Sequence, residues 1–392
     1  MKSIVYKKIP LPKYVFFQEG TGLRTWQWTS SGMKVINVTN ILGDDSGSVD
    51  ANNTDKFISQ NEFESRYRHF EVQNGDIVVA SSGNTYGKVG RIKRSNLPLM
   101  MNTSVIRFHS KDKNILNDDY LYCFLRSSYF KNQIEKYVIG GAQPNFGPTH
   151  LKKMFMPMPK ISEQLAIANN ITTYDKYLEN NCRRIQLLEE SAWLLYREWF
   201  VYLHFPGNEK LKKVDNVPAG WEKGFLGDIT KIKKGKNITF EQAIEGEVPV
   251  IGGGLEPTYF HNKANVCAPV VTVSASGANA GYVNLYYSDV WASDCSYMNK
   301  ETTKYIFYLF LMLKSLQAYI SGMQVGVAQP HVYPKDLIRL KILIPPEDLR
   351  KRFELLVTPI FDLIKILKHQ NQKLAQARDL LLPRLMSGKI KV

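Results

Sequence analysis

The 392-residue sequence lacks several features that mark familiar protein classes. Its four cysteines are scattered along the chain: Cys123, Cys182, Cys267 and Cys295. None belongs to a CxxC pair, so neither a zinc site nor a disulfide framework is indicated. The start of the sequence has no apolar signal-peptide core. The longest apolar run, Tyr305 to Leu313, is about half the length that a membrane span needs. We therefore expect a cytoplasmic protein that does not enter a membrane.

Catalytic motifs are also missing. The stretch Gly83 to Lys88, GNTYGK, is only loosely similar to a phosphate-binding P-loop, because Val89 replaces the Ser or Thr that would hold magnesium. It is interpreted as a tight turn. No Asn/Asp-Pro-Pro-aromatic motif of DNA amino-methyltransferases occurs, and no Asp/Glu-x-Lys triplet of common nucleases. The seven histidines show no metal-ligand spacing, and no G-x-S-x-G elbow is present. The sequence therefore favours a binding protein over an enzyme, with no metal or cofactor of its own.

The charge of the chain is strongly positive. Its net charge is +15 and its pI is near 9.4. Such a balance favours a polyanionic partner, with nucleic acid first and an anionic membrane surface second. The length suggests two or more domains.

Long passages of the sequence occur twice. Ile139 to Lys160 reads IGGAQPNFGPTHLKKMFMPMPK, and Val325 to Pro346, 186 residues later, reads VGVAQPHVYPKDLIRLKILIPP. Upstream, Val78 to Gly90 and Val271 to Val283 both predict a strand, a Ser-Gly turn and a second strand. A period this long indicates a duplicated module, since solenoid repeats are far shorter.

Each copy continues into a long helical pattern. In the first pattern the apolar positions alternate in steps of four and three residues: Ile167, Ile171, Tyr174, Leu178, Asn181, Ile185, Leu188, Ala192, Leu195 and Trp199. The second pattern follows the same rule: Leu349, Phe353, Leu356, Ile360, Leu363, Leu367, Gln370, Leu374, Ala377 and Leu381. This spacing predicts a coiled-coil seam with one polar layer per helix, formed by Asn181 and Gln370. Pro359 should kink or restart the second helix. The alternative is two amphipathic helices that pack on separate cores.

The predicted fold class is α+β, with two globular domains separated by two long antiparallel coiled-coil helices. The predicted boundaries are 1–160 for the first globule, 161–205 for the central helix, 206–346 for the second globule and 347–392 for the distal helix. The second helix must run back along the first if the two pair. The globules are then related by an internal pseudo-two-fold axis.

Two basic clusters are the candidate contacts to DNA, one in each copy. Lysine and arginine at turns suit phosphates, and amides can read base edges, although a solvated loop is the alternative for either cluster alone. The candidate residues in the first copy are Asn84, Tyr86, Lys88, Arg91, Lys93, Arg94, Gln143 and Asn145. Those in the second copy are Lys233, Lys234, Lys236, Asn237, Asn279, Gln329 and His331.

In the order of these parts, the chain resembles a type I restriction–modification specificity subunit over essentially its whole length. The passages that carry the resemblance are VFFQEGTGLRTWQW (15–28), SSGNTYGK (81–88), GGAQPNF (140–146) and FMPMPKISEQLAIA (155–168). The second copy departs from the first, with His331 in place of Asn145 and Arg350 in place of Gln164. This puts in doubt any transfer of base-contact roles between the copies.

The resemblance implies a prokaryotic, non-catalytic subunit whose two target-recognition domains each read half of an interrupted DNA site. Two methyltransferase subunits would use S-adenosylmethionine to methylate an adenine in each half-site. Restriction subunits would use ATP, with magnesium, to cleave unmodified DNA. These cofactors would belong to the partner subunits.

Four aromatic residues near the end of the first helix are candidates for the subunit interface: Trp193, Trp199, Phe200 and Tyr202. The alternative is that they pack against the second globule. Two other functions remain open at this point: an autonomous bipartite DNA-binding regulator, and a coiled-coil scaffold whose charge is incidental.

Overall fold

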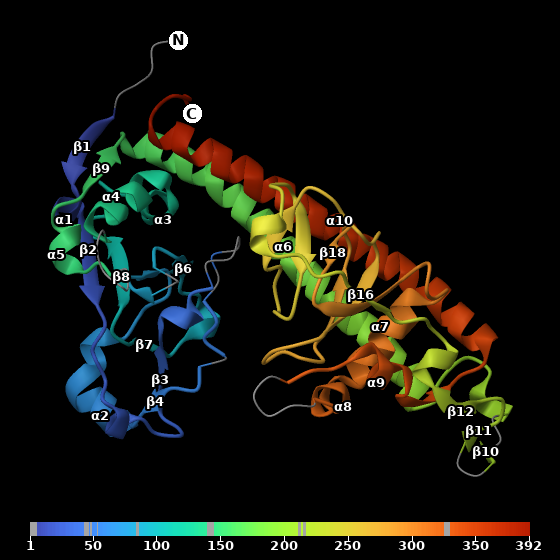
Figure 1. Cartoon of the computed structure of the whole chain (residues 1–392). Coiled ribbons are helices and arrows are strands. Elements are labelled where there is room, and N and C mark those ends of the chain that lie inside the picture. The colour runs from blue at the N-terminus through green and yellow to red at the C-terminus, as the bar shows by residue number, and fades with distance from the viewer. Residues whose placement is uncertain are drawn as a thin grey trace. The chain divides into compact units, whose positions relative to one another are not determined.

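The computed structural model describes residues 6–42, 47, 49–52, 54–83, 86–138, 145–210, 213–214, 217–324 and 330–392. The chain divides into two compact units. The first unit comprises Met1–Arg183 and His369–Val392, and the second comprises Arg184–Lys368. Each unit is a mixed α and β structure that contains part of both long helices (Figure 1).

The first unit contains two sheets and a separate strand pair. The four-stranded sheet is antiparallel, in the order β2 (Val15–Glu19), β8 (Val105–Ser110), β5 (Ile77–Ala80) and β6 (Val89–Arg91). The three-stranded sheet has the order β4 (Phe57–Ile58), β3 (Met33–Ile36) and β7 (Met100–Met101), and β3 and β7 are parallel. Strand β1 (Lys7–Pro10) pairs with β9 (Phe155–Met158). The sequence IVVA makes β5 a central strand because its β-branched side chains are buried on both faces.

Helices cover the four-stranded sheet of the first unit. They are α3 (Asp118–Arg126) and α4 (Ser128–Val138), with the short helices α1 (Leu11–Tyr14), α2 (Gln60–Glu62) and α5 (Pro148–Leu151) elsewhere. Helix α3 begins where the Asn117 side chain accepts the N–H of Tyr120 at 2.9 Å. Phe124 packs edge-on against Phe130, which packs edge-on against Phe108 of β8. These rings form the centre of the core.

The described residues of the second unit repeat both sheets and the strand pair of the first in the same order, and add a further short strand pair. Its four-stranded sheet has the order β13 (Lys233–Lys234), β19 (Cys295–Asn299), β16 (Val270–Ser274) and β17 (Val283–Tyr286). Its three-stranded sheet has the order β15 (Tyr259–His261), β14 (Val248–Ile251) and β18 (Trp291–Ala292), and β14 and β18 are parallel. Strand β12 (Glu222–Phe225) pairs with β20 (Lys341–Ile344), and β10 (Lys213–Val214) pairs with β11 (Val217–Pro218). The helices are α7 (Ile306–Ser315), α8 (Gln317–Gly322) and α9 (Pro334–Ile338). The predicted internal duplication is confirmed.

The long helices are α6 (Ile161–Tyr196) and α10 (Glu347–Met386). In the first unit the Asn181 amide donates to the side-chain oxygen of Asn371 at 2.9 Å, and Asp175 pairs with Arg378 at 3.1 Å. In the second unit Glu189 pairs with Lys368 at 3.3 Å. The residue numbers of the partners on α10 decrease as those on α6 increase, so the helices are antiparallel, as predicted.

The predicted seam is confirmed for α6 and, on α10, for Leu349, Phe353 and Leu367, which are buried; over the rest of α10 its phase is wrong. Most of the buried positions on α10 lie one residue beyond those predicted: Val357, Phe361, Ile364, Ala375, Arg378 and Leu382. Half-buried Asn371 follows the same shift. Leu356, by contrast, is 48% exposed. Repeated four-residue steps from Leu349 to Phe361 rotate the buried stripe away from a heptad spacing, because α10 also packs against α7. The polar partner of Asn181 is consequently Asn371, and Gln370 is exposed.

Helix α10 continues without interruption through Pro359, so the predicted restart at that residue is wrong. A proline inside a helix removes one backbone hydrogen bond and destabilises it. Val357 and Phe361, on either side of Pro359, are fully buried in the core of the second unit. Their packing offsets the lost bond.

A buried carboxylate of α10 holds the start of α7. Glu354 accepts the backbone N–H groups of Phe307 at 3.1 Å and Tyr308 at 2.9 Å, an arrangement that suits the positive end of a helix. Burial nevertheless raises the pKa of Glu354, and these backbone bonds oppose the shift without cancelling it.

The raised pKa predicts a pH dependence of stability. A carboxyl group whose pKa is higher in the folded state contributes fully below its ordinary pKa, and this contribution is lost as pH rises through the folded value. The unfolding free energy of the wild-type chain, relative to Glu354→Gln, should therefore fall as pH rises above about 4.5, by about 1.4 kcal/mol for each unit of pKa shift. Urea unfolding of both proteins at several pH values measures this difference. A difference that stays constant with pH contradicts the prediction.

Candidate nucleic-acid interface

The two repeated sequence motifs meet in space in both units. In the first unit Ser82, beside the glycine turn, forms a β-bridge with Asn145, and the N–H of Phe146 donates to the Ser81 carbonyl at 3.0 Å. In the second unit Ser276 forms the same bridge with His331. The junction passage is therefore attached to the glycine turn, so residues of both contribute to one surface.

The glycines of these turns have a conformational role. Gly83 and Gly87 have φ angles of 69° and 79°, and Gly277 and Gly281 have 80° and 84°. Residues with a Cβ atom rarely adopt positive φ angles such as these, so glycine is the residue that permits the turn. The interpretation of GNTYGK as a turn is supported by this geometry.

Three candidate residues, Asn84, Gln143 and Gln329, lie outside the described residues. Of the other candidates at the turns, Asn145 is exposed, while Tyr86 and Asn279 are half-buried. Tyr86 packs against the core of the first unit. His331 is half-buried and stacks on Tyr333, with the ring centroids 5.5 Å apart.

The first basic cluster is largely engaged inside its own unit. Lys88 donates to the Leu42 carbonyl at 2.9 Å. Arg91 binds the Asp119 carboxylate and lies 4.4 Å from the Tyr122 ring centroid, and Lys93 pairs with Glu179 of α6. Arg94 is exposed. Because neighbouring acids neutralise Arg91 and Lys93, Arg94 is the member of the cluster best placed for a phosphate.

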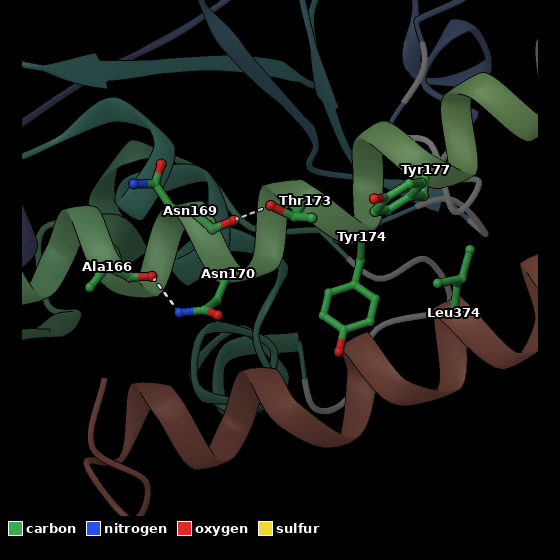
Figure 2. Close-up of a pocket in the computed structure, with 7 residues that line it drawn as sticks. All are labelled: Ala166, Asn169, Asn170, Thr173, Tyr174, Tyr177 and Leu374. Carbon is green, nitrogen blue, oxygen red and sulfur yellow. Dashed lines mark hydrogen bonds between the residues drawn. The ribbon is translucent and has the colours of Figure 1, made fainter.

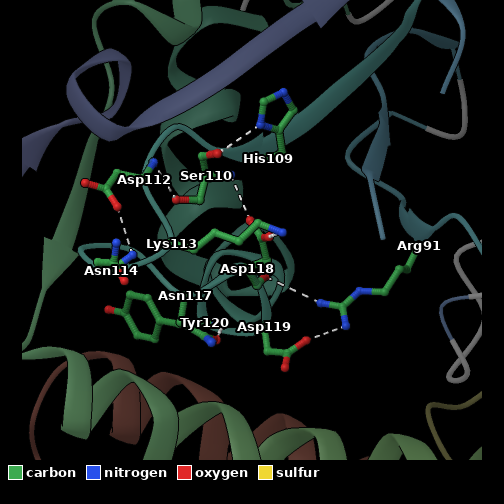
Figure 3. A network of polar contacts seen from close by, with 10 residues as sticks. All are labelled: Arg91, His109, Ser110, Asp112, Lys113, Asn114, Asn117, Asp118, Asp119 and Tyr120. Carbon is green, nitrogen blue, oxygen red and sulfur yellow. Dashed lines mark hydrogen bonds and ion pairs between the residues drawn. The ribbon is translucent and has the colours of Figure 1, made fainter. Parts of the chain in front are cut away.

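A polar network fixes the segment that holds Arg91. Figure 3 shows Arg91 reaching Asp119 at the start of α3. The adjacent Asp118 accepts the N–H of Ser110 at 2.8 Å and pairs with Lys113 at 3.1 Å. The network joins β8, α3 and β6, so its role is to hold the sheet and helix together.

The second basic cluster presents its side chains to solvent. Lys234, Lys236 and Asn237 are exposed, and Lys233 pairs with Glu301 at 3.1 Å. The backbone beneath them is fixed, since the N–H of Lys236 donates to the Ala292 carbonyl at 2.9 Å. Gly235 has no room for a side chain, because a Cβ would lie 2.1 Å from the Ser293 carbonyl oxygen. Exposed cations on a rigid backbone suit phosphate contact.

The aromatic cluster at the end of α6 corrects part of the predicted subunit interface. Trp199 and Phe200 pack in the core of the second unit. The ring centroids of Trp199 and Phe353 are 5.6 Å apart, and those of Phe200 and Tyr308 are 4.9 Å apart. Trp193 is half-buried. Packing on the second globule was the alternative, and it describes these three residues. Tyr202 is 46% exposed.

A groove of about 540 Å³ lies beside α6 in the first unit (Figure 2). Its lining residues are Ala166, Asn169, Asn170, Thr173, Tyr174, Tyr177 and Leu374. The Asn170 amide donates to the Ala166 carbonyl at 2.8 Å, and the Thr173 hydroxyl donates to the Asn169 carbonyl at 2.7 Å. With these groups bonded to the helix and no charged side chain in the lining, the groove does not have the character of a phosphate site.

The described part of the chain contains no group of three or more His, Cys, Asp or Glu side chains placed to hold a metal ion.

Among the described residues, no helix is both long enough and apolar enough to cross a lipid bilayer.

Sequence reasoning missed two features of the domains. One is a buried ionic cluster in which Asp175 pairs with both Arg126 and Arg378. The other is a pair of strongly exposed aromatic side chains, Trp26 and Phe240, on short turns. The only sequence signal for these turns is a glutamine that ends each of them, Gln27 and Gln242.

The structure thus defines a class of protein with two copies of one α+β domain and two long antiparallel helices. The chain belongs to the family of the type I restriction modification DNA specificity domain, whose model matches residues 27–190 and 218–376. The resemblance drawn from the sequence is confirmed.

Individual relatives agree with this family. The chain is 26% identical over 340 residues to the type I restriction enzyme MjaIX specificity subunit of Methanocaldococcus jannaschii, covering 78% of this chain and 76% of the relative. It is 20% identical over 351 residues to the MjaVIII specificity subunit of the same organism, covering 82% and 80%. The crystal structure of a type I restriction-modification S subunit from M. genitalium shares the fold, with a TM-score of 0.58, 19% identity and coverage of 97% and 96%.

Proposed function

We propose that this chain is the DNA-reading subunit of a type I restriction–modification complex and that each unit reads one half of an interrupted duplex site. The duplication is the observation that carries this proposal. The two units share one topology, yet Asn145 in the first corresponds to His331 in the second at the same bridge. Two related but different readers fit a bipartite, asymmetric sequence.

The electrostatics support duplex DNA as the ligand. The net charge of +15 favours a polyanion, and exposed Arg94, Lys234 and Lys236 offer phosphate contacts. In this proposal the chain is not itself an enzyme. It directs two methyltransferase subunits, which use S-adenosylmethionine to modify adenine, and restriction subunits, which use ATP and magnesium, to the site.

Mapping of DNA methylation tests the proposal directly. The full chain would be expressed with a type I methyltransferase subunit from the same genome, in a host without other DNA methylation. Sequencing should reveal one interrupted motif with a modified adenine in each half. The methyltransferase expressed alone is the control. Methylation that does not depend on this chain, or an uninterrupted motif, would contradict the proposal.

The second basic cluster gives a quantitative prediction. Replacing Lys234 and Lys236 together with glutamine should lower the slope of log affinity against log salt by about 2, because each phosphate contact contributes about 0.9. Fluorescence anisotropy with duplex DNA at several salt concentrations measures the slope. Glutamine at Lys223 and Lys351, exposed on β12 and α10, is the charge-matched control and should leave it unchanged. Equal salt slopes for both double variants would show that Lys234 and Lys236 do not contact the DNA.

A further inference from the structure

Each unit carries one strongly exposed aromatic side chain on a short 3-10 turn. Trp26 lies on the turn Thr25–Gln27 and is 75% exposed, and Phe240 lies on the turn Phe240–Gln242 and is 71% exposed. These are the most exposed large apolar side chains among the described residues. Both turns precede the central strand of a three-stranded sheet, β3 in the first unit and β14 in the second. An exposed ring therefore recurs on corresponding turns of the duplicated fold, at the second residue of the first turn and the first residue of the second.

Both turns are held rigidly. The backbone N–H of Arg24 donates to the Gln27 side chain at 2.8 Å, and the N–H of Thr239 donates to the Gln242 side chain at 3.1 Å. Gln27 is itself buried and donates to Tyr67 Oη at 2.9 Å. The turns close on themselves, so their aromatic side chains are presented from a fixed support.

The Phe240 ring has a second support. It packs edge-on against Tyr259 with the ring centroids 5.7 Å apart, and the Tyr259 hydroxyl donates to the Ile238 carbonyl. Most of the Phe240 side chain remains exposed despite this contact. An apolar ring that a rigid contact orients toward solvent is typical of a binding surface rather than of a core.

Exposed cations occur near both turns. Arg24 is exposed on the residue before the first turn. Exposed Arg66 lies beside Tyr67, the partner of Gln27, and pairs at 3.9 Å with Glu62, which also accepts from the Gln27 amide. In the second unit exposed Lys236 precedes the turn, and the Trp291 indole fixes its carbonyl with a hydrogen bond of 2.8 Å. One acid, Glu241, lies on the second turn, where its carboxylate is bonded to Thr239. An exposed aromatic ring on a turn with exposed cations nearby matches the combination of stacked bases and phosphates in a nucleic acid.

We infer that Trp26 and Phe240 are apolar base-contacting residues, one for each half of the DNA site, that insert against a base step of the duplex. Apolar side chains used in this way partly unstack the step and bend the duplex. The occurrence of one such ring in each copy fits a ligand with two halves. This inference rests on the proposed function, because it names how each unit would engage its half-site.

The test uses the full chain and a fluorescent duplex that contains the motif found by methylation mapping. Trp26→Ala and Phe240→Ala should each weaken binding by about 10-fold or more, as loss of a stacked aromatic does elsewhere. Trp26→Phe should retain most of the affinity. The salt slope should not change, because an apolar contact releases no counterions. The unchanged salt slope distinguishes the role of the two rings from that of Lys234 and Lys236, whose replacement lowers the slope.

Matched controls truncate other exposed aromatic residues. Phe155→Ala in β9 and Phe225→Ala in β12 remove side chains that are each 46% exposed, and they should bind DNA like the wild type. Thermal unfolding of all four alanine variants checks that the fold is intact. Insertion itself is read with 2-aminopurine placed along each half-site, whose fluorescence should rise at one step with the wild type and not with the alanine variant of the corresponding unit.

The outcomes separate the inference from the proposed function. A wild-type chain that gives no sequence-dependent binding or methylation contradicts the function itself. A wild type that binds the motif, together with alanine variants of equal affinity, overturns only the inference. Alanine variants that bind DNA normally but no longer associate with the methyltransferase subunit also overturn it, since the rings would then face a protein. A loss of affinity with no 2-aminopurine response overturns insertion.

Discussion

Replacing Asp175 with alanine should destabilise the first unit by about 3 to 5 kcal/mol, the cost of removing one member of a largely buried ionic cluster. The Asp175 carboxylate pairs with Arg126 at 2.6 Å and with Arg378 at 3.1 Å. The exposed fractions of the three side chains are 12%, 11% and 5%, so water cannot replace the lost acid. Although burial opposes its charge, bonds and charges from Asp379 and Asp175 hold the pKa of Arg378 above its ordinary value.

Urea unfolding of the wild type and Asp175→Ala measures this loss. A matched control is Glu179→Ala, four residues further along α6, whose carboxylate is 55% exposed in its pair with Lys93. An exposed pair contributes at most about 1 kcal/mol, so this variant should stay close to the wild type. If both variants lost the same stability, burial of the Asp175 cluster would not be the cause.

The sequence predicts the repeated architecture because each copy leaves strong local signals. The apolar run at Ile77–Ala80 and its counterpart at Val270–Ser274 become the central strands of the two large sheets. The three-stranded sheets leave almost no signal. Strands such as β7 and β18 have two residues each, and they join β3 and β14 in parallel over long sequence separations. Local patterns carry no information about such pairings.

The seam of α6 could be read from the sequence because its apolar positions form one stripe. On α10 the apolar residues are adjacent, as in Leu355, Leu356 and Val357. Several phases then fit the pattern equally well, and tertiary contacts such as the packing of Phe361 on Phe307 of α7 select one. The same limit applies to charge. The sequence shows Lys93, but its partner Glu179 is 86 residues away. A basic run is therefore a weaker indication of a DNA contact than the exposure of each cation.

Aromatic residues present a related difficulty. Sequence reasoning treats Trp199 and Trp26 alike, as large apolar side chains. The structure places Trp199 in the core at 6% exposure and leaves Trp26 at 75%. The difference arises from tertiary contacts, since Phe353 packs against Trp199 while the turn that carries Trp26 leaves this side chain exposed. Burial can be assigned only once these contacts are known.

Exchanging the first globule should change one half of the methylated motif and leave the other half intact. The exchange replaces residues 1–160 with the corresponding segment of a family member that has a different target. The reason is that β2, β5, β6, β8 and their turns form a separate core from that of the second unit. Methylation mapping before and after the exchange measures both halves in one experiment. A change in both halves would contradict independent reading.

The structure also specifies how the graft must be made. The globule contacts α6 through Arg126, which binds Asp175, and through the N–H of Asn117, which donates to the Gln164 side chain at 2.9 Å. A donor segment without a cation at the position of Arg126 removes one of the two arginines that pair with Asp175. The stability of the resulting chimaera should therefore fall. Restoring arginine there should recover the fold while the new half-site specificity is kept. If specificity instead followed the residue at position 126, the reading surface would lie at the helix contact rather than at the turns.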